Sequence, residues 1–70
     1  MTGRAPQWQE PDGTPIACRD KLEILNENYE ELRHVMQDAF EDAVLMGVDE
    51  HQIRDAIEAL TKTLKSPKKR

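Results

Sequence analysis

Apolar residues in the central part of the chain recur at alternating spacings of four and three residues. Such a 4-3 alternation places every member on one face of a long helix, as in the a and d positions of a heptad repeat. No glycine or proline interrupts the chain between Pro15 and Gly47, and Thr14 before Pro15 is a typical helix start. We therefore predict a first helix over 15–46. Its apolar face comprises Cys18, Leu22, Leu25, Tyr29, Leu32, Met36, Ala39, Ala43 and Met46.

A second, shorter helix is predicted over 49–65. Gly47 supplies a left-handed stop for the first helix, and Asp49 with Gln52 three residues later resembles a capping box. The apolar residues that follow also keep helical spacing, and Pro67 prevents continuation. The expected fold is all-α: an antiparallel two-helix hairpin over 15–65, with a long first helix and a shorter second helix. The apolar face of the second helix comprises Ile53, Ala56, Ile57, Leu60 and Leu64.

The segments before and after the predicted hairpin differ from it in composition. Residues 1–14 contain Pro11-Asp12-Gly13, a turn signature, and no helical or strand period, so we expect an extended or disordered arm. Trp8 is its only large apolar residue, and it either stays in solvent or docks on the helices as an anchor. Residues 66–70 form a basic tail.

The unequal lengths of the two helices predict a homodimer. At ~1.5 Å per residue the first helix is roughly 45 Å long and the second roughly 25 Å, so the second covers only half of the first. A chain of 70 residues with a single cysteine also has a small core and no internal disulfide. We expect two hairpins to form a four-helix bundle. The predicted interface residues are Cys18, Leu22, Leu25, Tyr29, Leu32, Met36 and Phe40.

Acidic residues dominate the outward face of the first helix. Without residues 65–70, which carry four basic side chains, the net charge falls from −4 to −8. This charge argues against a nucleic-acid surface, and binding of nucleic acid through the basic tail is the weaker alternative. The acidic face is either solvated or docks a partner protein with a basic surface. The candidate partner-binding residues are Trp8, Glu27, Glu31 and Asp38.

A metal-dependent or redox-responsive role is the other alternative. Glu31 and His34 have the Glu-x-x-His spacing of di-iron carboxylate bundles, but the heptad places both at outward positions. Cys18 lies near the predicted helix start, where the helix dipole lowers the pKa of a thiol. The chain contains no nucleophile–base spacing, phosphate loop, CxxC or HExxH motif, so we expect neither catalysis nor a cofactor.

Taken together, these patterns indicate a small helical accessory or adaptor protein that acts by protein–protein interaction. No apolar run approaches the ~20 residues that a membrane-spanning helix requires. A lone thiol suits a reducing compartment, so we expect a soluble, unexported and cytoplasmic protein.

Overall fold

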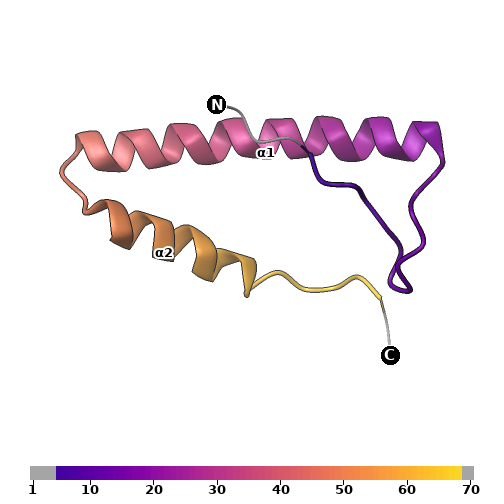
Figure 1. The fold of residues 1–70 in the computed structure, drawn as a ribbon. Helices are drawn as coiled ribbons and strands as arrows, with labels where there is room; N and C mark the ends of the chain where they lie inside the picture. The colour runs from indigo at the N-terminus through magenta and orange to yellow at the C-terminus, as the bar shows by residue number, and fades with distance from the viewer. Residues whose placement is uncertain (1–4, 69–70) are drawn as a thin grey trace. The chain divides into compact units, whose positions relative to one another are not determined.

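The computed structural model describes residues 5–68, and these form two helices, α1 (Arg19–Leu45) and α2 (Glu50–Thr61) (Figure 1). Within this part of the chain there is no strand, only an isolated antiparallel bridge between Gln9 and Pro15. The predicted all-α, two-helix hairpin is therefore confirmed. The chain divides into two compact units, Met1–Val35 and Met36–Arg70, with the boundary inside α1.

The first helix begins at Arg19, so the predicted start at Pro15 is wrong. Pro15 instead pairs with Gln9, and the N–H of Ile16 donates to the carbonyl of Trp8 at 3.0 Å. This extended pairing commits residues 14–16 to a hairpin and excludes them from a helix. The first helical hydrogen bond runs from the N–H of Leu22 to the carbonyl of Cys18 at 3.0 Å. Cys18 thus occupies the N-cap position, one residue before the helix to which the heptad assigned it, and it is exposed.

Residues 8–16 form a short hairpin, which we call the strap. The N–H of Gly13 donates to the carbonyl of Glu10 at 2.8 Å, and the N–H of Glu10 donates to the carbonyl of Thr14, also at 2.8 Å. Gly13 has a φ of 93°, as in a three-residue hairpin loop that closes with a glycine bulge. The Thr14 N–H also donates to Asp12 Oδ1 at 2.9 Å, which lowers the pKa of the Asp12 carboxyl. The turn signature at residues 11–13 therefore forms a turn.

The connection between the helices follows the predicted local signals. Gly47 has a φ of 99°, and its N–H donates to the carbonyl of Val44 at 3.0 Å. The N–H of Val48 donates to the carbonyl of Ala43 at 2.9 Å, which completes a Schellman motif. Asp49 caps α2, because its Oδ2 accepts from the N–H of Gln52 at 3.0 Å. The helix stop and the N-cap are thus confirmed.

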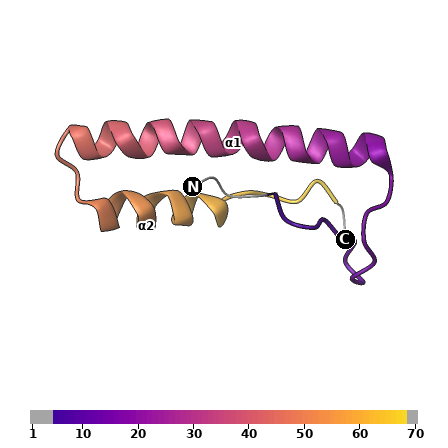
Figure 2. The ribbon, with the colours of Figure 1, turned by 45° about the horizontal axis from the view of Figure 1, so that its top comes forward.

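In the second unit, α2 runs back alongside the end of α1 (Figures 1 and 2). Ile53 and Ile57 of α2 are half-buried, as are Phe40 and Val44 of α1. The guanidinium of Arg54 lies 4.6 Å from the centre of the Phe40 ring, which is a cation–π contact. Helix α2 ends at Thr61, earlier than the predicted Lys65, and its last backbone hydrogen bonds tighten into three-residue turns.

Neither helix in the described part of the chain has both the length and the apolar character needed to span a membrane.

Candidate interaction surfaces

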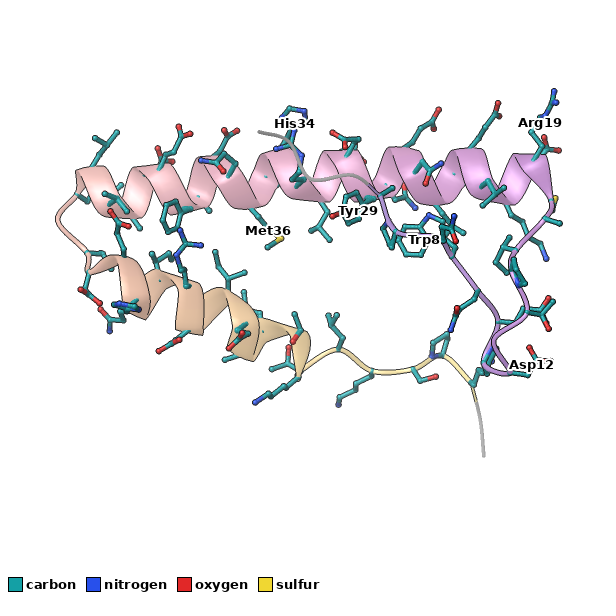
Figure 3. The ribbon with its side chains drawn as sticks, viewed as in Figure 1. Trp8, Asp12, Arg19, Tyr29, His34 and Met36 are labelled. Carbon is teal, nitrogen blue, oxygen red and sulfur yellow. The ribbon has the colours of Figure 1, made fainter. Side chains whose placement is uncertain are left out.

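Trp8 anchors the strap to the first half of α1. Its Nε1–H donates to Asn26 Oδ1 at 2.8 Å, and its ring meets Tyr29 edge-on, with the ring centres 6.0 Å apart and the planes at 74° (Figure 3). Trp8 is half-buried, as are Leu22 and Leu25 on the same side of α1. Trp8 therefore docks on α1, as the second of the two alternatives for this residue proposed. The unequal helix lengths predicted that the first half of the apolar face of α1 would be uncovered, but the strap covers part of it.

A second strip of α1 remains exposed beside this face. We call it the α1 stripe and define it as Ile24, Asn28, Leu32 and Val35, whose spacing of four, four and three residues keeps them on one side of the helix. Leu32 is 58% exposed and Val35 is 62% exposed. Asn28, Glu31, Leu32 and Val35 line a shallow depression there. The heptad pattern includes Leu32 but does not identify the stripe as a separate surface.

The end of α2 carries a further exposed apolar surface. Leu60 and Leu64 continue the spacing of Ile53 and Ile57, yet they are 63% and 77% exposed. The start of the apolar face of α2 is therefore packed and its end is uncovered. The apolar spacing did not reveal this surface, because spacing alone does not indicate how far along α2 the side chains stay in contact with α1.

Basic residues lie between and after these two leucines in the sequence. After Glu58 the sequence contains no acidic residue, and Lys62, Lys65 and Lys68 are all exposed. Ser66 Oγ accepts from the N–H of Lys68 at 3.1 Å, which forms a turn after Pro67. We call residues 60–68 the C-terminal segment.

The predicted acidic residues lie along the edge of the α1 stripe. Glu27, Glu31 and Asp38 are exposed, and their spacing of four and seven residues places them on one side of α1. Glu30, on a neighbouring face, contacts Arg33, with Oε1 and Nη2 3.5 Å apart. Within residues 5–68 no basic side chain pairs with Glu27, Glu31 or Asp38. This edge presents uncompensated negative charge.

The remaining predicted interface residues lie in different surroundings. Met36 is 39% exposed. Phe40 is half-buried beneath Arg54, so its ring is already covered within the second unit.

The metal and thiol candidates do not converge on one site. Glu31 and His34 are both exposed, and within residues 5–68 no group of three His, Cys, Asp or Glu side chains comes together (Figure 3). Cys18 is exposed as well. The backbone N–H of Lys21 in the first helical turn lowers the pKa of the Cys18 thiol.

Comparison with known protein families, with curated proteins and with solved structures gives no match to this chain. The candidate surfaces are therefore interpreted from their own chemistry.

Proposed function

We propose that this chain is a non-enzymatic helical accessory protein that acts by protein–protein interaction as a homodimer. The supporting observation is its exposed surface. Every described side chain is either half-buried or exposed, and the residues 5–68 contain no buried apolar core. Because apolar burial is the dominant favourable term in folding, a second chain is the simplest source of further burial.

The exposed apolar side chains support the same proposal. On α1, Leu32 is 58% exposed and Val35 is 62% exposed, and after the packed part of α2, Leu60 is 63% exposed and Leu64 is 77% exposed. Exposed apolar surface of this kind is typical of an interaction site. Two hairpins that pair through their uncovered apolar surfaces would form a four-helix bundle.

In this proposal, the acidic edge of α1 is the surface that binds the partner protein. Glu27, Glu31 and Asp38 form a negative surface with no basic partner in the described part of the chain. A protein with a basic surface is the complementary partner, and electrostatic attraction would accelerate its association. We place this role in the cytoplasm, where a single free thiol such as Cys18 stays reduced.

Sedimentation of the wild type and of two variants tests the homodimer. Leu32→Glu places a charge on the exposed α1 stripe, and Leu45→Glu is the matched control, since Leu45 is 85% exposed on another face of α1. We expect wild-type and Leu45→Glu chains to sediment as dimers at micromolar concentration and Leu32→Glu chains to sediment as monomers. A wild type that is helical and monomeric under these conditions would contradict the proposal.

A further inference from the structure

The α1 stripe and the C-terminal segment both expose apolar side chains, and the charged residues beside them have opposite signs. The stripe exposes Leu32 and Val35 and is edged by Glu27 and Glu31. The segment exposes Leu60 and Leu64.

Leu60 lies in the last turn of α2, and Leu64 lies just beyond the end of this helix at Thr61. They are four residues apart, and the backbone between them keeps short-range turns, with the N–H of Thr63 donating to the carbonyl of Leu60 at 3.0 Å. Both leucine side chains are exposed, so they are available to an apolar surface of another chain. Lys62 lies between the two leucines and Lys65 follows Leu64, so the segment combines exposed apolar side chains with positive charges. Such a segment is complementary to an apolar strip that is edged by negative charge.

From this complementarity we infer that the C-terminal segment of one copy docks on the α1 stripe of a second copy. This inference rests on the proposed homodimer and names the basic surface that the acidic edge recognises. Lys62 and Lys65 of one copy face Glu27 and Glu31 of the other, while the leucines cover Leu32 and Val35. Since both copies carry both surfaces, a two-fold axis makes the contact twice and closes the dimer.

Charge reversal on the two surfaces tests this contact directly. The first variant carries Glu27→Lys and Glu31→Lys, and the second carries Lys62→Glu and Lys65→Glu. In either homodimer, like charges face each other at both contacts. In a mixed dimer, one contact has the wild-type charges and the other has both charges reversed, so both contacts join opposite charges.

The matched control carries Glu10→Lys and Asp55→Lys, the same change in net charge at exposed positions outside α1. Sedimentation at low ionic strength measures the dissociation constant of each variant and of an equimolar mixture with one chain labelled. We expect each charge-reversal variant to dimerise at least about tenfold more weakly, because repulsion replaces attraction at both contacts. We expect the mixture to recover wild-type affinity and the control to retain it. Added salt should reduce these differences, since exposed charges are screened.

Three results would overturn the inference while leaving the homodimer intact. They are dimers of wild-type strength in both charge-reversal variants, a mixture that fails to recover, and a control that weakens as much as the variants. Lysine-dependent binding of the wild type to a DNA duplex, with normal dimerisation of the Lys62→Glu, Lys65→Glu variant, would assign the segment to nucleic acid instead. A monomeric wild type would contradict the proposed homodimer itself, so the two failures are distinguishable.

Discussion

Removing the side-chain amide of Asn26 is expected to release the strap without unfolding α1. Asn26 Oδ1 accepts from Trp8 Nε1 at 2.8 Å, and a hydrogen bond of this kind contributes about 0.5–1.5 kcal/mol. Asn26→Ala should therefore lower the ratio of docked to released strap by roughly two- to tenfold. The edge-on contact with Tyr29 adds about 0.5–1.5 kcal/mol, so Tyr29→Ala should have an effect of similar size. Alanine favours the helix at both positions, and α1 should keep its helical signal.

Tryptophan fluorescence measures this equilibrium directly, because Trp8 is the only tryptophan in the chain. In the wild type the emission should be shifted to shorter wavelength and protected from acrylamide. Asn26→Ala and Tyr29→Ala should shift the emission to longer wavelength and increase quenching. Asn28→Ala is the matched control, since Asn28 lies on the α1 stripe and the Trp8 indole donates to Asn26 instead.

Two results would refute the docked strap. One is a wild-type emission identical to that of the chain unfolded in urea. The other is an equal response of Asn26→Ala and Asn28→Ala, which would show that Trp8 does not distinguish the two amides.

The capping residues and the thiol give three further predictions. Gly47→Ala should destabilise the hairpin by about 1–2 kcal/mol, because the φ of 99° is unfavourable for alanine even though open space surrounds the position. Asp49→Ala should lower the free energy of unfolding by about 1 kcal/mol, because it removes the N-cap hydrogen bond to Gln52. Asp55→Ala, at an exposed position of α2, is the control, and urea unfolding followed by circular dichroism measures both variants. Cys18 has a pKa below the ordinary 9.0, so iodoacetamide should reach half its maximal rate at lower pH in the folded chain than in urea. The Cys18 thiolate therefore stabilises the folded chain at a pH above the pKa that the thiol has in the unfolded chain. This stabilisation is lost as the pH falls through the lower pKa that the thiol has in the folded chain.

Features encoded by neighbouring residues could be predicted from the sequence. Gly47 and Asp49 form the expected stop and cap because their hydrogen bonds join residues three to five positions apart in the chain. The long helix follows from its 4-3 apolar spacing, which the structure keeps from Leu22 onwards. The sequence also makes Glu27, Glu31 and Trp8 candidates for partner binding, and this role stays a prediction.

The start of α1 could not be predicted from the same kind of signal. Thr14 and Pro15 suit a helix start, but they also suit the returning side of a hairpin, and the pairing with Gln9 decides between the two. The turn at residues 11–13, flanked by Trp8 and Ile16, was the signal that favoured the hairpin. The contact of Trp8 with Asn26 spans 18 positions and depends on packing that no local pattern contains.

The uncovered end of α2 was missed for a related reason. Leu60 and Leu64 have the same spacing as Ile53 and Ile57, so the pattern assigns all four to one packed face. Their different burial depends on how far the two helices remain in contact, which is a property of the folded chain.

The dependence of thermal unfolding on protein concentration tests most directly whether a second chain completes the fold. Association that stabilises only the folded state raises the midpoint of unfolding with concentration by mass action. Followed by circular dichroism, the wild type should therefore unfold at a higher temperature when its concentration is raised from the micromolar range. An unfolding midpoint that stays constant over that range, in a chain that sediments with the 8.1 kDa mass of a monomer, would contradict the proposed homodimer.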